Sequence, residues 1–112
     1  LMEFNTRSGR VKHFIAEPLS EAVLSGADLY GAMLFTGSFP QACFDRAQLA
    51  GADLKEGDFT GASFRDANLG LNNLGGATQL QGACFRGAVY DGGTVFPEGF
   101  SPEGHGLVCV LG

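Results

Sequence analysis

Residues 47–69 read AQLAGADLKEGDFTGASFRDANL, and a leucine or phenylalanine stands at every fifth position from Leu49 to Leu69. The same spacing extends in both directions, so that every fifth residue from Leu19 to Leu74 is leucine or phenylalanine. Alanine or glycine stands two positions before most of these residues. A helix repeats apolar residues every three to four positions and a strand every two, so a period of five fits neither. The spacing therefore predicts a repeating coil.

An interruption occurs near Thr78 and Gln79, where one extra residue breaks the count of five. The spacing then resumes at Leu80, Phe85 and Tyr90. A single inserted residue can be absorbed locally as a bulge. We therefore expect a bulge or widened corner here, after which the same three side chains still point inward.

Several units of this repeat resemble the A(D/N)LxX unit of the pentapeptide-repeat family: Ala27–Gly31, Ala47–Gly51, Ala52–Leu54 and Ala67–Leu69. The ending Tyr90–Pro97 is similar to the tails of cyanobacterial-type members. The resemblance implies an all-β fold, a right-handed quadrilateral β-helix with four repeats to a coil, and residues 17–91 would form nearly four coils. We expect residues 1–16 to form an N-terminal cap or arm and residues 92–112 to form a C-terminal capping tail.

Four repeats to a coil would place side chains twenty residues apart in the same column, with coils about 4.8 Å apart. Phenylalanine then falls on two faces and leucine on the other two, with Phe85 expected in the column of Phe44 and Phe64. Rings in such columns can stack with an offset. The predicted core consists of Leu29, Leu34, Phe39, Phe44, Leu49, Leu54, Phe59, Phe64, Leu69, Leu74 and Phe85.

The tail is too apolar for a solvated linker, yet its spacing matches no further repeat. Its apolar residues are Phe96, Phe100, Leu107, Val108 and Val110. An uncovered coil would expose backbone donors and acceptors that invite edge-to-edge pairing. We therefore expect these side chains to cover the last coil.

The chain has a formal net charge of −5, and the repeat block is acidic. Direct binding to nucleic acid is therefore not expected. No apolar run is long enough to cross a membrane, and no charged region followed by an apolar segment marks a signal peptide. An odd count of three cysteines argues against a complete disulfide framework. A cytoplasmic location is the expectation, with the thylakoid lumen or the periplasm left open.

No arrangement of residues in the sequence indicates catalysis, a cofactor or a metal site. His13 and His105 lie in opposite terminal segments, and no phosphate-binding or dinucleotide-binding motif is present. Cys43 and Cys84 each precede a phenylalanine, and the spacing predicts that they point outward on one face, two coils apart. That separation of about 9.6 Å is too large for a disulfide or a shared zinc ion. We expect unpaired thiols, with a redox or metal role as the alternative.

Two surface features stand out. Asp45–Arg46 and Arg65–Asp66 would stack with opposite charges over each other, which predicts a solvated square of ion pairs. Tyr30, Met33 and Phe35 form an apolar patch on one corner, where later coils carry smaller or polar residues. The N-terminal segment would cover this patch, or the patch would contact another protein.

These observations favour a non-enzymatic structural or protein-binding module with a rigid acidic β-helical surface, acting as a monomer or a tail-mediated dimer with an unknown protein partner. The family resemblance implies an alternative, because some pentapeptide-repeat proteins mimic duplex DNA and bind a type II topoisomerase such as DNA gyrase. Against it, the rod is only about 15 to 20 Å long. Arg46, Arg65 and Arg86 also interrupt its negative surface.

Overall fold

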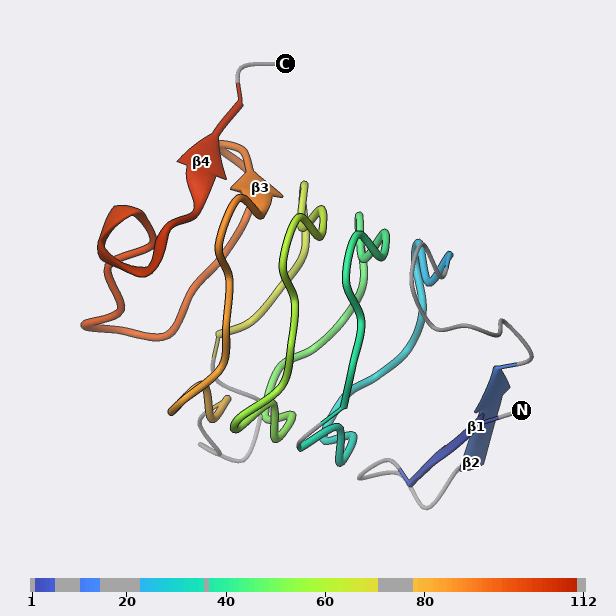
Figure 1. Cartoon of the computed structure of the whole chain (residues 1–112). Helices are drawn as coiled ribbons and strands as arrows, with labels where there is room; N and C mark the ends of the chain where they lie inside the picture. Colours follow the sequence, from blue (N-terminus) through green and yellow to red (C-terminus); the bar gives the residue numbers. More distant parts are fainter. Residues whose placement is uncertain (1, 6–10, 15–22, 36, 71–77, 111–112) are drawn as a thin grey trace.

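The computed structural model describes residues 2–5, 11–14, 23–35, 37–70 and 78–110. Its regular elements are β1 (Met2–Asn5), β2 (Val11–Phe14), β3 (Val89–Tyr90), the 3₁₀ helix η1 (Glu103–His105) and β4 (Val108–Cys109). Strands β1 and β2 pair antiparallel, whereas β3 and β4 pair parallel. Figure 1 shows stacked coils, with the β1–β2 hairpin at one end and β4 at the other. No helix within the described ranges has the length and apolar character needed to span a bilayer.

Isolated parallel bridges hold the coils together. Val23 bridges Cys43 and Cys43 bridges Ser63, so each residue pairs with the one twenty positions later. Successive bridges are five residues apart, as at Val23 and Asp28, and the series returns to its starting column after four steps. Each coil therefore has four bridged sides, and the chain forms a β-helix solenoid.

The outward side chains at these bridges define four faces. Face 1 carries Val23, Cys43, Ser63, Val89 and Val108; face 2 carries Asp28, Gln48, Asn68 and Val95; face 3 carries Met33, Asp53 and Gln79; face 4 carries Ser38, Asp58 and Cys84. Faces 1 and 3 lie on opposite sides of the solenoid, because the chain visits the faces in numerical order.

A tight turn joins each face to the next. The carbonyl oxygen of an inward residue accepts a hydrogen bond from the N–H three residues later, as from Ala62 to Phe59 at 3.0 Å. The third residue of the turn has a positive φ, which defines a type II turn and favours glycine. Glycine occupies this position at residues 26, 31, 51, 61, 82 and 87, whereas Gln41, Arg46, Glu56 and Asp66 adopt φ of 55–62°. A left-handed conformation costs a non-glycine residue about 1–2 kcal/mol.

Stacked aromatic rings fill the centre of the solenoid. The rings of Phe39 and Phe59 are 5.6 Å apart and nearly parallel, and those of Phe44 and Phe64 are 5.2 Å apart and nearly parallel. The two stacks meet edge to face, as between Phe44 and Phe59 at 5.8 Å. The predicted core side chains that the structure describes are all buried: Leu29, Leu34, Phe39, Phe44, Leu49, Leu54, Phe59, Phe64, Leu69 and Phe85.

The predicted one-residue bulge near Thr78 is wrong, but Leu80 and Phe85 are buried in the core and Tyr90 packs against it, as predicted. Asp53 bridges Gln79 and Asp58 bridges Cys84, so these partners lie twenty-six positions apart instead of twenty. The connection after Gly70 is therefore six residues longer than the corresponding connection in the preceding coil. With a period of five, an insertion of one residue and an insertion of six residues shift the later inward positions by the same amount. The spacing alone therefore could not distinguish the two insertions.

The longer connection changes the stacking partners in the last coil. Phe85 stacks on Phe59 at 5.4 Å, instead of on Phe64 as predicted, and meets Phe64 edge to face at 5.8 Å. Leu80 follows Leu54 in its column, because Asp53 and Gln79 are bridged. Leu74, which the sequence places there, lies outside the described residues.

Thr78, at the end of this longer connection, forms hydrogen bonds to both neighbouring coils. Its buried hydroxyl donates a hydrogen bond to the carbonyl oxygen of Gly70 at 2.8 Å and accepts one from the N–H of Gly51 at 3.0 Å. Thr78 also occupies the slot two residues before an inward leucine, where other repeats carry alanine or glycine. One hydroxyl thus connects two neighbouring coils at the point where the repeat is interrupted.

The tail packs on the last coil through aromatic contacts. The ring of Phe100 lies 6.0 Å from Phe85 and 5.3 Å from Phe96, and Phe96 meets Tyr90 edge to face at 5.3 Å. Leu107 is buried, but Val108 is 52% exposed because β4 adds a further rung to face 1 and turns this side chain outward. The expectation that Val108 covers the coil is therefore wrong.

Candidate interaction surface

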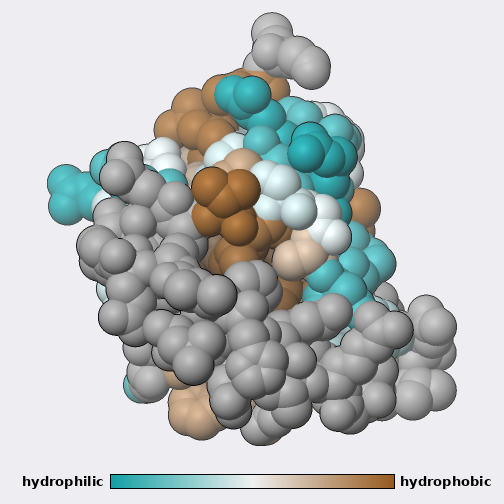
Figure 2. Space-filling model, turned by 90° about the vertical axis from the view of Figure 1, so that its right-hand side faces the viewer, coloured by the Kyte–Doolittle hydropathy of each residue, from teal (hydrophilic) through white to brown (hydrophobic). Residues whose placement is uncertain are grey.

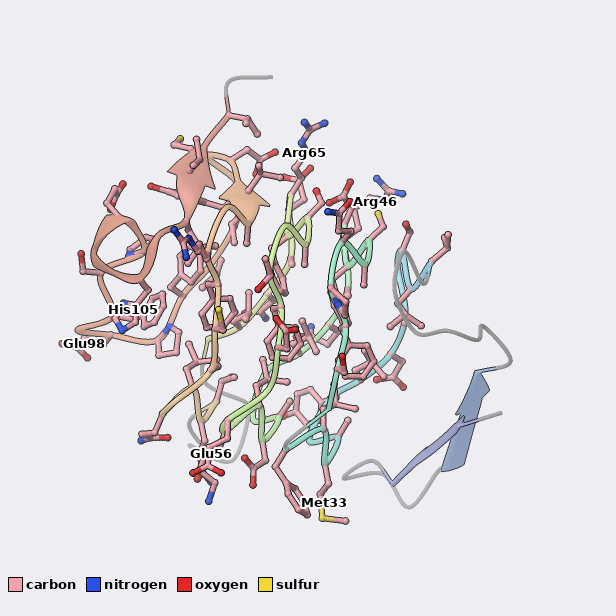
Figure 3. The ribbon with its side chains drawn as sticks, in the orientation of Figure 1. Met33, Arg46, Glu56, Arg65, Glu98 and His105 are labelled. Carbon is pink, nitrogen blue, oxygen red and sulfur yellow. The ribbon has the colours of Figure 1, made fainter. Side chains whose placement is uncertain are left out.

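The predicted apolar patch spans one side of the first coil and not a single corner. Met33 lies on face 3, while Tyr30 and Phe35 lie at the two corners that flank it. Met33 and Phe35 are 51% and 52% exposed, and Tyr30 is half-buried. Figure 3 shows Met33 pointing away from the solenoid. The structure therefore presents two large apolar side chains at the surface of this face.

A shallow depression of about 300 Å³ adjoins the patch and is lined by Phe35, Asp53, Lys55 and Glu56. The Lys55 ammonium lies 3.8 Å from the Asp53 carboxylate. Glu56 is exposed and adopts the left-handed conformation. Sequence reasoning did not single out this charged rim; the only signal was a glutamate at a turn position that commonly holds glycine. The arrangement suits a partner side chain that is apolar with a polar end.

The acidic and amide side chains that precede the inward residues support the backbone. The carboxylates of Asp53 and Asp58 accept hydrogen bonds from the N–H groups two residues later, both at 3.1 Å. Asn68 does the same for Gly70 at 2.9 Å. The hydroxyl and N–H of Thr60 together lower the pKa of Asp58. These side chains act as local turn supports, which explains their recurrence in the repeat without any catalytic role.

A second surface, which we call the charged corner, follows face 1 and comprises Asp45, Arg46, Arg65, Asp66 and Asp91. The predicted square of ion pairs does not form, because no ion pair joins Arg46 to Asp66 or Arg65 to Asp45 in the described structure. Asp45 instead accepts hydrogen bonds from the hydroxyl of Ser63 and the N–H of Arg65. The Asp45 carboxylate, which the prediction paired with a guanidinium, is thus engaged by a backbone N–H and a hydroxyl.

The prediction that Cys43 and Cys84 share a face is wrong. Cys43 lies on face 1 and Cys84 on face 4, because the longer connection shifts the last coil by one side. All three cysteines are free thiols. Thr60 donates its single hydroxyl proton to Asp58 at 2.6 Å, so the Cys84 thiol, 3.3 Å away, is the donor to Thr60. No three metal-ligating side chains converge in the part of the chain that the structure describes.

The tail carries another depression, of about 280 Å³, between the last coil and η1. Phe100 and His105 lie along it with their rings stacked 4.3 Å apart. Nearby, the Tyr90 hydroxyl donates a hydrogen bond to Glu103, which raises the pKa of Tyr90 to about 12 and lowers that of Glu103. These contacts fasten the tail to the last coil, so we assign them a structural role.

Comparison with known families matches residues 42–78 to pentapeptide repeats, in eight copies. A solved pentapeptide repeat protein from Nostoc Pcc 7120 is 31% identical over 82% of this chain and 79% of that chain, with a TM-score of 0.46. A pentapeptide repeat protein from the thylakoid lumen of Arabidopsis thaliana is 33% identical over 70% of this chain and 57% of that chain, with a TM-score of 0.40. No curated protein sequence matches the chain.

Proposed function

Because the chain belongs to the pentapeptide-repeat family, whose members are generally structural or binding modules, we propose that it is a non-enzymatic module that binds a protein partner through face 3. The right-handed sense of the solenoid and its nearly four coils, implied by the family resemblance, are part of this proposal.

The observation that carries the proposal is the exposure of Met33 and Phe35 beside a depression with a charged rim. Methionine adapts its shape to a partner surface, and aromatic side chains are enriched at protein interfaces. The ion pair between Lys55 and Asp53 provides a polar rim. An apolar centre with a polar edge is the usual composition of a protein contact surface.

The stacked core supports the same proposal. The Phe59 ring is stacked between Phe39 and Phe85 and meets the neighbouring stack of Phe44 and Phe64 edge to face, so the faces are held by close-packed side chains. A surface that is already ordered loses little conformational entropy on binding. The solenoid thus presents its faces in a fixed arrangement.

The test is site-specific photo-crosslinking in an extract of the source organism, with a photoreactive residue at Met33 and, as a matched control, at the exposed Ser38 on face 4. We expect the photoreactive residue at position 33 to cross-link one protein. An excess of wild-type protein without the photoreactive residue should compete with this cross-linking, whereas an excess of a Met33→Asp variant should not. Equal labelling from both positions, or equal displacement by the variant, would contradict the proposal.

A supercoiling assay separates this function from DNA mimicry. Inhibition of DNA gyrase by the purified protein at stoichiometric concentrations would support the alternative. Unchanged gyrase activity together with specific labelling at Met33 would support the protein-binding module.

A further inference from the structure

We propose that the last rung of face 3 is a strand-addition site, where an extended segment of a partner protein pairs with residues 79–82 as a further rung. The segment turns a leucine-sized apolar side chain towards the core and carries basic residues at its ends. The patch at Met33 is two rungs away on the same face and takes no part in this site.

Backbone hydrogen bonds join the successive rungs of face 3. The N–H groups of Leu54 and Glu56 donate to carbonyl oxygens of the rung at Gln79, at 2.8 and 2.9 Å. In return, the N–H of Gln79 donates to the carbonyl oxygen of Ala52 at 2.9 Å. A rung of this face thus offers two donors and one acceptor to the rung that follows it.

The rung at Gln79 has the same three groups but no rung beyond it. They are the N–H groups of Leu80 and Gly82 and the carbonyl oxygen of Thr78, and none of them forms a hydrogen bond with another residue that the structure describes. Thr78 and Leu80 are only 5% and 9% exposed. Backbone groups at buried residues are nearly always paired. An extended segment supplies the missing partners, as strand addition does at an open sheet edge.

The tail provides such partners on other faces of the last coil. Val108 of β4 adds a rung to face 1, and Val95 adds one to face 2. On face 4, the carbonyl oxygen of Gly106 accepts a hydrogen bond from the N–H of Gly87 at 3.0 Å. On face 3, no described tail residue forms a rung or a backbone hydrogen bond with residues 78–82. The tail therefore leaves this face open.

The depression of about 280 Å³ lies at this open rung. Leu80 and Gly82 line it from the last coil, and Phe100 and His105 line it from the tail. The tail side is held in place, because the Phe100 ring stacks on His105 at 4.3 Å and on Phe96 at 5.3 Å. With the coil on one side and the tail on the other, the depression admits a single extended chain and excludes the end of a second solenoid.

The residues around the depression indicate which side chains the segment carries. Leu80 ends the inward column of Leu34 and Leu54, so the next inward side chain in this column is apolar. Glu98 is exposed and lines the depression, whereas no lysine or arginine lines it. Figure 3 shows Glu98 and His105 on the same part of the tail. A basic residue in the segment complements this rim.

Hydrogen exchange of the protein alone tests whether the rung is open. The N–H groups of Leu80 and Gly82 should exchange faster than those of Leu54 and Glu56, which occupy the same positions one rung earlier and are hydrogen-bonded. NMR spectroscopy resolves the four groups separately. Equal protection of the two pairs overturns the proposal.

Titration with the peptide acetyl-Lys-Ala-Asn-Leu-Lys-Gly-amide, followed by NMR, tests strand addition. We expect saturable shifts of the N–H resonances of Leu80 and Gly82, slower exchange of both groups, and a dissociation constant on the order of a millimolar for so short a segment. Figure 2 shows hydrophobic side chains at the opposite end of the solenoid as well. Shifts confined to residues 23–35, or no saturable shift at Leu80 and Gly82, overturn the proposal.

Matched changes separate the backbone from the side-chain contribution. Methylation of the asparagine N–H in the peptide removes the donor to Thr78 and should weaken binding about threefold to tenfold. Glu98→Lys should weaken binding about twofold to fivefold, and glutamate in place of both peptide lysines should restore it. Met33→Asp should bind the peptide as the wild type does, which distinguishes this site from the partner surface. Equal binding of the methylated peptide overturns strand pairing, and equal binding by Glu98→Lys overturns the basic character of the segment.

Discussion

Substitution of Gly57 by alanine tests whether the aromatic stacks are as tightly packed as the structure indicates. Gly57 stands two residues before Phe59, in the small slot that alanine fills in neighbouring repeats, and its φ is not positive. At such a position, alanine normally stabilises a protein by about 0.4–1 kcal/mol, because it restricts the unfolded chain. The backbone conformation alone therefore predicts a small gain in stability.

The structure reverses the sign of this effect. A Cβ atom at residue 57 would lie 2.5 Å from Cε2 of Phe59 and 3.2 Å from the carbonyl oxygen of Leu54. The Phe59 ring cannot turn aside, because it is stacked between Phe39 at 5.6 Å and Phe85 at 5.4 Å. Overpacking of a core costs about 1–3 kcal/mol. We expect a net loss of about 1–2 kcal/mol in the free energy of unfolding.

Urea denaturation followed by circular dichroism measures this change. Gly92→Ala is the matched control, because nothing lies within 4 Å of its Cβ position and its φ is not positive; it should be neutral or slightly stabilising. Gly57→Ala combined with Phe59→Leu should cost less than the sum of the two single changes, since the smaller side chain removes the clash. Stabilisation by Gly57→Ala equal to that by Gly92→Ala would refute the reasoning.

Three further predictions concern the core, the long connection and the tail. Phe64→Ala should lower the free energy of unfolding by about 3–5 kcal/mol, because it opens a cavity beside Phe44 and Phe85; a loss below about 1 kcal/mol in urea denaturation would contradict this packing. Thr78→Val should cost about 1–3 kcal/mol by leaving the N–H of Gly51 unpaired, whereas Thr78→Ser should cost less; equal thermal stability of the two variants would exclude the role of the hydroxyl. The hydrogen bond from Tyr90 to Glu103 raises the pKa of Tyr90 to about 12 in the folded protein, against 10.0 ordinarily. The contribution of this hydrogen bond to stability is therefore complete below pH 10 and is lost as the pH rises towards 12. The melting temperature of Tyr90→Phe should lack this loss between pH 10 and 12, and identical pH profiles of the variant and the wild type would contradict the assignment.

The five-residue spacing was sufficient to predict a repeating coil, and the resemblance of its units to pentapeptide repeats implied the β-helix solenoid. The residues that form each repeat lie within that repeat. They are a leucine or phenylalanine that is buried, a small residue two positions before it, and often an aspartate or asparagine whose side chain accepts a hydrogen bond from the N–H two residues later, as Asn68 does for Gly70. These are interactions within a few residues of the chain, so a period in the sequence reports them directly. The apolar patch at Met33 was found for the same reason, since it breaks the pattern of its column.

The stacking of the last coil was decided only by the tertiary structure. The five-residue spacing predicts that Phe85 points inward, but it does not predict which ring Phe85 stacks on. The hydrogen bonds between coils determine that register, and they pair Asp58 with Cys84 because the connection after Gly70 is six residues longer and not one. The same register places Cys84 on face 4, and the pairing of Val89 with Val108 turns Val108 outward on face 1. These features depend on contacts between residues nineteen or more positions apart, for which the spacing of one repeat contains no information.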